Sequence, residues 1–206
     1  MKLLDARFAT SAVDARGIPA DGVPHIALVG RSNVGKSSII NALARRTLAR
    51  TSAAPGKTRL ANLYRFALDG GPGGPGRWSV YLADLPGYGY ARGGQASVAE
   101  LRRIAEEYFR SFEGVSSSPS ALRGVLQLVD ARHPGLEPDI DAATWLETLG
   151  TERAVLATKV DKLSRSERNR NLKELERQLG TAPLPVSAAS GEGLDDLWTL
   201  IARLSR

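Results

Sequence analysis

Apolar runs and segments of helical period alternate along most of this chain. Short apolar runs predict strands at residues 25–29, 60–68, 78–83, 122–129 and 154–157, with a last short strand that ends in residues 185–189. Apolar positions spaced three and four residues apart predict helices at about 36–46, 95–112, 138–149, 164–179 and 191–204. Strands and helices in alternation are typical of an α/β fold.

The first 24 residues carry few large apolar side chains. Two glycines and two prolines interrupt their second half, which favours a loop. We predict an N-terminal lead-in over residues 1–24, with an edge strand at about 7–13 followed by that loop. A single domain over residues 25–206 would follow, because a chain of 206 residues has about the length of one domain with a substantial core.

The composition is that of an ordinary globular protein, with 42% hydrophobic and 24% charged residues. No apolar run approaches the roughly 18 residues of a membrane span, and the first residues lack the apolar core of a signal peptide. The chain has no cysteine, which excludes disulfides, thiolate metal sites and cysteine nucleophiles. We therefore expect a cytoplasmic protein without a membrane span.

The net charge of +6 and the isoelectric point near 9.9 favour an anionic partner. Most of the basic residues are Arg, whose planar fork binds phosphate oxygens bidentately, so nucleic-acid contact is the favoured interpretation. A coding bias toward Arg is the alternative. The basic side of the helix that Ser164 opens is more simply interpreted as a solvated face, and His25 and His133 as loop or surface histidines.

A glycine-rich stretch joins the predicted strand at 25–29 to the predicted helix at 36–46. It matches the G-x-x-x-x-G-K-S phosphate-binding loop, in which successive backbone N–H groups and a helix N-terminus face a polyphosphate. Lys36 would reach the β- and γ-phosphates, and the Ser37 hydroxyl would bind Mg²⁺. An ordinary glycine-rich turn is the alternative. The nucleotide-binding residues expected here are Gly30, Arg31, Ser32, Asn33, Val34, Gly35, Lys36, Ser37 and Ser38.

Residues 47–59 show no sustained hydrophobic period and include a Pro-Gly pair, which predicts a mobile loop. In nucleotide switches such a loop carries a Thr that joins Mg²⁺ and senses the γ-phosphate. Thr47, Thr51 and Thr58 all qualify, and we favour Thr58 because it lies just before the next strand. The nucleotide-binding residues expected here are Pro55, Gly56, Lys57 and Thr58.

An aspartate ends the apolar run at 78–83 and is followed by x-x-Gly. The Asp84 carboxylate is expected to hold Mg²⁺, commonly through water, and the N–H of Gly87 to meet the γ-phosphate. The tetrapeptide alone could be a plain turn, but its place at a strand end about fifty residues after the phosphate loop fits the second half of such a site. The contact residues expected here are Asp84, Leu85, Pro86 and Gly87.

The stretch that follows the apolar run at 154–157 has the [N/T]-K-x-D pattern of guanine-nucleotide proteins. The Asp161 carboxylate can accept hydrogen bonds from N1–H and N2–H₂ of guanine, whereas adenine has no donor at either position. The stem of Lys159 would lie along the base and ribose, and Ser187 with its neighbouring backbone could approach guanine O6. The base-binding residues expected are Thr158, Lys159, Asp161, Lys162, Val186, Ser187, Ala188 and Ala189.

These motifs, in this order, resemble the five motifs of a translation-factor-class GTPase, and they cover nearly the whole chain. The longer strings are similar to those of the EngB/YsxC (YihA) family, within the TrmE-Era-EngA-EngB-Septin-like superfamily. Members of that family are small single-domain bacterial GTPases that act in assembly of the large ribosomal subunit. The strings that carry the resemblance are GRSNVGKSS at 30–38, PGKT at 55–58, DLPGYGYA at 84–91, DxRHP at 130–134 and TKxDK at 158–162.

The resemblance implies a Ras-like fold, with a mostly parallel six- or seven-stranded sheet, one antiparallel edge pair and helices on both faces. It implies GTP and GDP as ligands, Mg²⁺ held by Ser37, Thr58 and Asp84, and catalytic roles for Lys36, Thr58 and Gly87. The implied partners are the large ribosomal subunit or its precursor and ribosomal RNA, with a link to cell-division septation. We expect a monomer.

Two residues depart from the general GTPase pattern. Tyr88 stands where Ras-like enzymes carry the Gln that orients the attacking water, so we predict slow intrinsic hydrolysis. Asn33 stands where potassium-activated relatives of this class hold K⁺ beside the phosphates, and we expect K⁺ there; an Asn that caps the loop is the alternative.

A GTP-hydrolysing switch is the leading hypothesis, with loops around 47–60 and 87–94 that order with GTP and relax with GDP. Its basic surface would dock on ribosomal RNA. A GTP-gated, RNA-associated scaffold with incidental hydrolysis is the alternative that Tyr88 supports. A metabolic phosphotransferase or ATPase on the same loop comes third, and the pattern at 158–161 speaks against it. The sequence leaves open what Arg132 and His133 contact.

Overall fold

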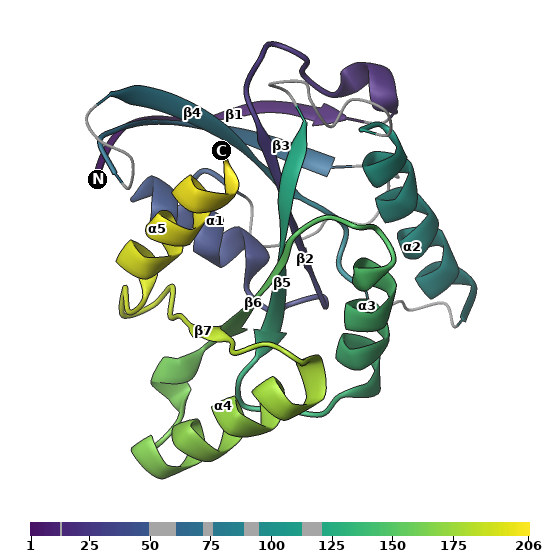
Figure 1. Cartoon of the computed structure of the whole chain (residues 1–206), viewed down its shortest axis with the longest axis vertical. Helices are drawn as coiled ribbons and strands as arrows, with labels where there is room; N and C mark the ends of the chain where they lie inside the picture. Colours follow the sequence, from purple (N-terminus) through teal and green to yellow (C-terminus); the bar gives the residue numbers. More distant parts are fainter. Residues whose placement is uncertain (13, 50–60, 72–75, 89–94, 113–120) are drawn as a thin grey trace.

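The structure is a computed structural model that describes residues 1–12, 14–49, 61–71, 76–88, 95–112 and 121–206. Seven strands form one sheet in the order β1-β3-β4-β2-β5-β6-β7 (Figure 1). The strands are β1 (Lys2–Ala12), β2 (His25–Gly30), β3 (Ala61–Asp69), β4 (Arg77–Asp84), β5 (Leu122–Asp130), β6 (Arg153–Thr158) and β7 (Leu184–Pro185). The helices are α1 (Lys36–Ala44), α2 (Gln95–Arg110), α3 (Glu137–Glu147), α4 (Arg165–Leu179) and α5 (Leu194–Leu204), with short 3₁₀ turns η1 (Ala15–Gly17) and η2 (Val160–Lys162).

The sheet is mostly parallel, as the resemblance implies. Strand β3 is antiparallel to both of its neighbours, β1 and β4, and the pairings β4–β2, β2–β5, β5–β6 and β6–β7 are parallel. The expected antiparallel edge pair is therefore β1 with β3. Where β3 and β4 approach each other at the far end of their pairing, the Gly70 N–H donates to the Gly76 carbonyl (3.0 Å).

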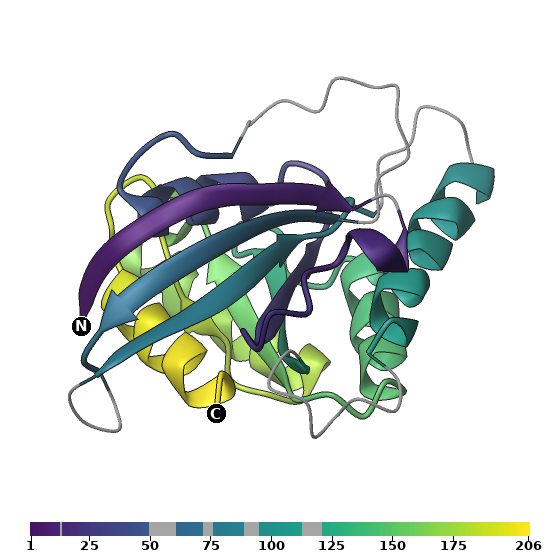
Figure 2. The same ribbon diagram turned by 90° about the horizontal axis from the view of Figure 1, so that it is seen from above.

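Helices cover both faces of the sheet, and the strands show why. On β5, Leu126 and Leu128 join the core that packs under α1 and α5, whereas Val125 and Val129 point to the opposite face, toward α2, α3 and α4. Figures 1 and 2 show α1 and α5 on one side of the sheet and α2 and α3 on the other. A parallel strand covered on both faces is mostly apolar, which explains why the central strands are largely apolar runs in the sequence.

The prediction for the first strand was partly wrong. An edge strand is present, but it covers Lys2–Ala12 rather than residues 7–13. Its register against β3 shifts between Leu3 and Asp5 and again between Phe8 and Thr10. Each shift is a bulge that moves the following side chains to the other face, so the alternation that marks a strand is broken in the sequence.

His25 is not a loop or surface histidine. It begins β2, is fully buried, and stacks on Tyr81 with ring centroids 4.8 Å apart. Its Nδ1 lies 3.3 Å from the Tyr108 hydroxyl and its Nε2 lies 3.1 Å from the Pro19 carbonyl oxygen. Burial lowers its pKa to about 4, so the ring is neutral at physiological pH. His133, by contrast, is exposed as expected.

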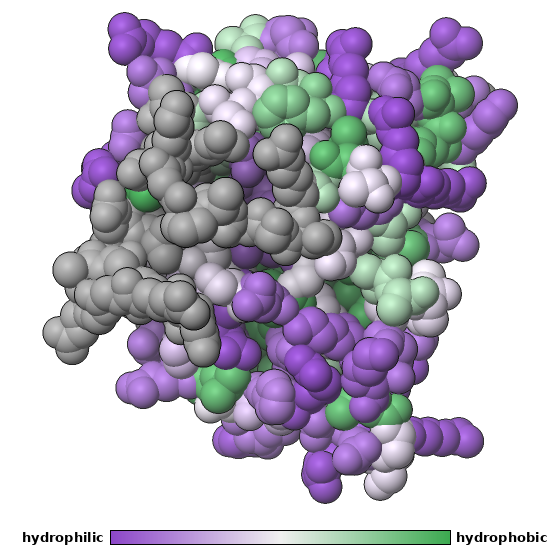
Figure 3. Space-filling view, turned by 180° about the vertical axis from the view of Figure 1, so that it is seen from behind, coloured by the Kyte–Doolittle hydropathy of each residue, from purple (hydrophilic) through white to green (hydrophobic). Residues whose placement is uncertain are grey.

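The described surface is mainly polar. Figure 3 shows that hydrophilic side chains predominate on the face seen from behind, with apolar ones in small separate groups. The large apolar residues that are exposed lie on or beside β1: Met1, Leu4 and Phe8. Within the described part of the chain, no helix has the length and apolar character needed to cross a membrane.

Candidate functional site

The stretch between β2 and α1 forms a tight loop at the carboxyl edge of the sheet. Gly30 leaves no room for a side chain, since a Cβ there would lie 2.7 Å from the Leu128 carbonyl oxygen. Gly35 has φ +118°, which only glycine adopts readily, and it begins α1 without a side-chain cap. Asn33 also has a left-handed backbone, with φ +63°. The N–H groups at the start of α1 are thus available to an anion, as expected of a phosphate-binding loop.

The Lys36 ammonium lies within this loop. Its Nζ donates to the Gly30 carbonyl oxygen at 3.1 Å, and the residue is 8% exposed. Burial lowers the pKa of Lys36, and the nearby Asp84 carboxylate opposes that shift. A buried lysine at the centre of a phosphate loop is placed to neutralise anionic oxygens.

Ser37 and Asp84 come together as the sequence predicts. The Ser37 hydroxyl, in the first turn of α1, donates to Asp84 Oδ2 at the end of β4, at 2.9 Å. Burial raises the pKa of Asp84, while Lys36 and the hydrogen bond from Ser37 lower it. A hydroxyl and a carboxylate side by side are the hard oxygen donors that Mg²⁺ prefers. Thr58, Pro55, Gly56 and Lys57 lie outside the described residues.

The segment after β4 packs against the phosphate loop. Leu85 is buried, and its N–H donates to the Leu28 carbonyl of β2 (3.3 Å). The Ser32 N–H donates to the Tyr88 carbonyl (3.0 Å), and a Cβ on Gly87 would lie 2.7 Å from the Ser32 nitrogen. Glycine at position 87 therefore permits the two backbones to meet, which places its own backbone at the loop that would hold the phosphates.

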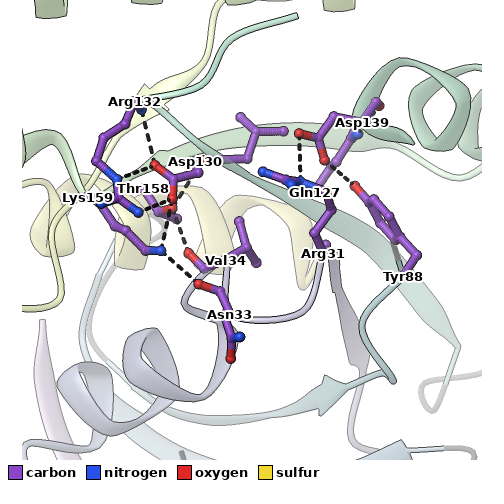
Figure 4. A network of polar contacts seen from close by, with 12 residues as sticks. Arg31, Asn33, Val34, Tyr88, Gln127, Asp130, Arg132, Asp139, Thr158 and Lys159 are labelled. Atoms are coloured by element: carbon purple, nitrogen blue, oxygen red, sulfur yellow. Dashed lines mark hydrogen bonds and ion pairs between the residues drawn. The ribbon is translucent and has the colours of Figure 1, made fainter. Parts of the chain in front are cut away.

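The Tyr88 side chain points toward α3 (Figure 4). Its hydroxyl donates to Asp139 Oδ1 at 3.0 Å, and burial, followed by the nearby Asp139 charge, raises the pKa of Tyr88 well above its usual range. Asp139 Oδ2 lies 3.3 Å from Arg31 Nε, an ion-pair contact without hydrogen-bond geometry, and the Asp139 carbonyl accepts from Gln127 Nε2 at 2.8 Å. The buried carboxylate of Asp139, in the first turn of α3, thus contacts both Arg31 of the phosphate loop and Tyr88.

Sequence reasoning missed Asp139 and Gln127. Asp139 looks like an ordinary acidic residue in the first turn of a helix, where the helix dipole favours it. Gln127 lies inside a buried strand and is fully buried. The one available signal was a polar residue inside an otherwise apolar run.

The loop after β6 is tied directly to the phosphate loop. The Thr158 hydroxyl donates to the carbonyl of Val34 at 2.8 Å and to that of Val129 at 3.1 Å. Lys159 Nζ donates to the Asn33 carbonyl at 2.7 Å. The contacts with Val34 and Asn33 span more than 120 residues of sequence, and they bring the [N/T]-K-x-D element beside the element expected to hold phosphates.

Asp161 lies beside the loop after β7. Its Oδ1 accepts from the Ser187 hydroxyl at 2.6 Å, and its Oδ2 lies 3.3 Å from Lys162 Nζ. The hydrogen bond from Ser187 is the main reason why the pKa of Asp161 is lowered, so this carboxylate stays an acceptor. Ser187 Oγ in turn accepts from the backbone N–H groups of Ala189 and Ser190 (3.2 and 3.1 Å).

The remaining predicted base-binding residues flank this contact. Val186 is fully buried, and its N–H donates to the Ala157 carbonyl at 2.8 Å, which aligns the loop after β7 with β6. Ala188 follows Ser187 in the same loop. The two elements predicted to bind guanine, the loops after β6 and β7, therefore lie on one side of this edge of the sheet. The phosphate loop lies on the other side.

Asp130, which ends β5, completes this edge. Its carboxylate accepts from Arg132 and from Lys159, at 2.8 to 2.9 Å (Figure 4). The sequence showed Asp130 and Arg132 only as part of a longer string, without a role.

The fold and this arrangement define a class of protein, the P-loop GTPases. The family model described as "50S ribosome-binding GTPase" matches residues 25–159, well over half of the chain. Solved structures share the fold. A probable GTP-binding protein engB covers 88% of this chain and 98% of its own at a TM-score of 0.59 and 20% identity, and Era, solved with MgGDPNP and a segment of 16S ribosomal RNA, covers 88% and 56% at 0.64 and 23%.

Sequence relatives identify the family. The chain is 41% identical to the probable GTP-binding protein EngB of Anaeromyxobacter sp. (strain K), over all of this chain and 93% of that protein. It is 42% identical to the EngB of Pelotomaculum thermopropionicum, over 98% and 96%. The chain therefore belongs to the EngB family of GTP-binding proteins, which are GTP hydrolases, and the resemblance inferred from the motifs is confirmed.

Proposed function

We propose that this GTPase is a molecular switch in assembly of the large ribosomal subunit, and that it binds ribosomal RNA or a pre-ribosomal particle in its GTP state. The observation that carries the proposal is that the residues predicted to bind the phosphates and those predicted to bind the base lie together at one edge of the sheet. Ser37 and Asp84 meet at 2.9 Å on one side, and Lys159 reaches the phosphate loop at Asn33 on the other. The description of the matched family as ribosome-binding, the rRNA bound by Era and the net charge of +6 support the choice of partner.

In this proposal the predicted residues keep the roles that their motifs imply. Lys36 and the loop N–H groups bind the phosphates, and Gly87 and Thr58 sense the γ-phosphate. Asp161, with Ser187, binds the guanine edge. Ser37, Asp84 and Thr58 would hold Mg²⁺, which neutralises phosphate charge when bound. Asn33, exposed and with a left-handed backbone, is our proposed K⁺ residue.

We further propose that hydrolysis by the isolated protein is slow. The Tyr88 hydroxyl donates to Asp139, and a phenol has no amide donor and acceptor pair to orient a water. The same observation favours the second candidate, a GTP-gated scaffold on RNA whose hydrolysis is incidental. A cytoplasmic monomer, a role in septation and the division into residues 1–24 and 25–206 remain predictions.

GTP turnover measured with and without large ribosomal subunits tests the proposal, in KCl and in NaCl. We expect slow turnover alone, strong acceleration by large subunits but not by small ones, and a higher rate in KCl. Binding to subunits should weaken steeply as salt rises, since phosphate contacts release counterions. GTP-dependent binding without acceleration would favour the scaffold. Absence of binding to large subunits, or fast turnover alone, would contradict the proposal.

A further inference from the structure

A short chain of polar contacts runs from the loop after β5 to the phosphate loop (Figure 4). Arg132 donates through Nε to Asp130 Oδ1 at 2.9 Å and through an Nη to Oδ2 at 2.8 Å. Asp130 Oδ2 also accepts from Lys159 Nζ at 2.9 Å. Lys159 Nζ then donates to the Asn33 carbonyl at 2.7 Å.

The Asp130 carboxylate is held in its charged form. Its side chain is 5% exposed, and burial alone would raise its pKa. The hydrogen bonds from Arg132 and Lys159 outweigh burial and hold the pKa of Asp130 well below its usual range. The carboxylate therefore stays charged, and a strong acceptor, at neutral pH.

The Lys159 side chain needs such an acceptor to hold it in one conformation. It has a left-handed backbone, φ +61°, and its side chain is 30% exposed. A free lysine side chain samples many rotamers, and ordering it on a ligand costs conformational entropy. Two acceptors from different loops, Asp130 and the Asn33 carbonyl, fix its ammonium before any nucleotide arrives, so that its aliphatic stem is already laid across the edge of the site.

Arg132 orders the carboxylate in turn. Its backbone N–H donates to Asp130 Oδ1 at 3.1 Å, and its guanidinium fork engages both carboxylate oxygens. The Arg132 side chain is 39% exposed. Its contact with Asp130 fixes the plane of the carboxylate, which leaves Oδ2 directed at Lys159.

We propose that Asp130 is a positioning residue for guanine-nucleotide binding, supported by Arg132, and that it slows nucleotide release by holding Lys159 in place. This rests on the proposed binding of guanine nucleotide at this edge. It assigns a role to the Asp-x-Arg string that sequence reasoning left open.

The chain contains its own control. Asp14-Ala15-Arg16 repeats the tripeptide Asp130-Ala131-Arg132, and Asp14 accepts from the Arg16 backbone at 2.9 Å and from its guanidinium at 3.0 Å. Among the described residues, Asp14 makes no hydrogen bond or ion pair with a lysine. Asp14→Asn thus removes the same local chemistry at a distance from the site.

The test is the dissociation rate of a fluorescent GDP analogue, chased with excess GDP. The variants are Asp130→Asn, Lys159→Met, the double variant and Asp14→Asn. Lys159→Met keeps the aliphatic stem and removes the ammonium. We expect release to accelerate about tenfold in Asp130→Asn, the size typical of a lost charge-assisted contact behind a ligand, and to be unchanged in Asp14→Asn.

The double variant separates positioning from general weakening of the fold. If Asp130 acts through Lys159, Asp130→Asn adds nothing in the Lys159→Met background. Accelerations that multiply in the double variant, or release at the wild-type rate in Asp130→Asn, would overturn the proposal. Arg132→Met, expected to accelerate release about threefold, keeps the test decisive if Asp130→Asn does not fold. If the wild-type chain binds no GDP analogue, the proposed function itself fails, which is a distinguishable result.

Discussion

The chain contains the tripeptide Asp-Ala-Arg three times: residues 5–7 lie within β1, and the copies at 14–16 and 130–132 share a local geometry and differ in their surroundings. In both, the aspartate accepts from the backbone and the guanidinium of the arginine two residues later. The Asp14 side chain is 39% exposed and that of Arg16 is 93% exposed, against 5% and 39% for Asp130 and Arg132. Asp14 caps a short 3₁₀ turn, whereas Asp130 also meets Lys159, which lies 29 residues further along the chain.

This comparison shows that the fold, and not the tripeptide itself, makes Asp130 part of a site. The side chain of an aspartate bonds readily to the backbone two residues on, so the tripeptide forms the same turn in either place. The pKa of Asp14 is lowered chiefly by its hydrogen bond from Arg16, in solvent, while that of Asp130 is lowered against the effect of burial. Only the fold, by placing β6 beside β5, turns one copy into part of a site.

The largest contrast is expected in stability. Asp130→Ala should lower the free energy of unfolding by about 3 kcal/mol, because it removes the charge-assisted hydrogen bonds that Lys159 and Arg132 make to a carboxylate that is only 5% exposed. Asp14→Ala should move the denaturation midpoint far less. Urea unfolding of the nucleotide-free protein measures both, and equal losses would show that burial does not separate the two copies.

The two histidines offer the same contrast as a function of pH. His25 is buried and its pKa is lowered to about 4, whereas His133 is exposed. Between pH 8 and 5 the unfolded chain binds a proton at His25 and the folded chain does not, so stability falls as pH falls below about 6.5, by about 2 kcal/mol at pH 5. Unfolding curves should show this loss in the wild type and in His133→Gln. A similar loss in His25→Gln would contradict the assignment to His25.

Asp139 is a third aspartate for this comparison: it is buried, and it accepts a hydrogen bond from a neutral donor, the Tyr88 hydroxyl. Tyr88→Phe removes one hydroxyl and leaves Asp139 Oδ1 without that hydrogen bond, which should cost about 1 kcal/mol of stability. Because the hydroxyl faces α3, GTP turnover should stay within about twofold of the wild type. Thermal unfolding and a phosphate-release assay measure the two effects. A large fall in turnover would place the phenol in the chemistry after all.

Much of the site could be predicted from sequence because its motifs are local. The glycines of residues 30–35, the lysine and serine after them, and an aspartate at a strand end each have a chemistry that depends on near neighbours. Their order along an α/β chain then places them at one edge, since the carboxyl ends of parallel strands lie together. The Ser37–Asp84 contact confirms that part.

The rest depended on which side chains meet across the fold. Nothing local distinguishes Asp130 from Asp14, or shows that Tyr88 meets Asp139 some fifty residues away. The bulges in β1 hid its true start, and the burial of His25 follows from three aromatic rings supplied by β4 and the end of α2. Such contacts are set by tertiary packing, which overrides local pattern.

The central proposal is that Asp161 recognises guanine at this edge of the sheet. Exchanging the base and its acceptor together tests this proposal most directly. Asp161→Asn should lower affinity for GTP about a hundredfold and raise affinity for xanthosine triphosphate, whose C2 carbonyl can accept from the new amide. Asp195→Asn, an exposed aspartate on α5, is the control and should change neither affinity. If Asp161→Asn binds GTP as the wild type does and gains nothing for the xanthine nucleotide, the assignment of the guanine site is wrong.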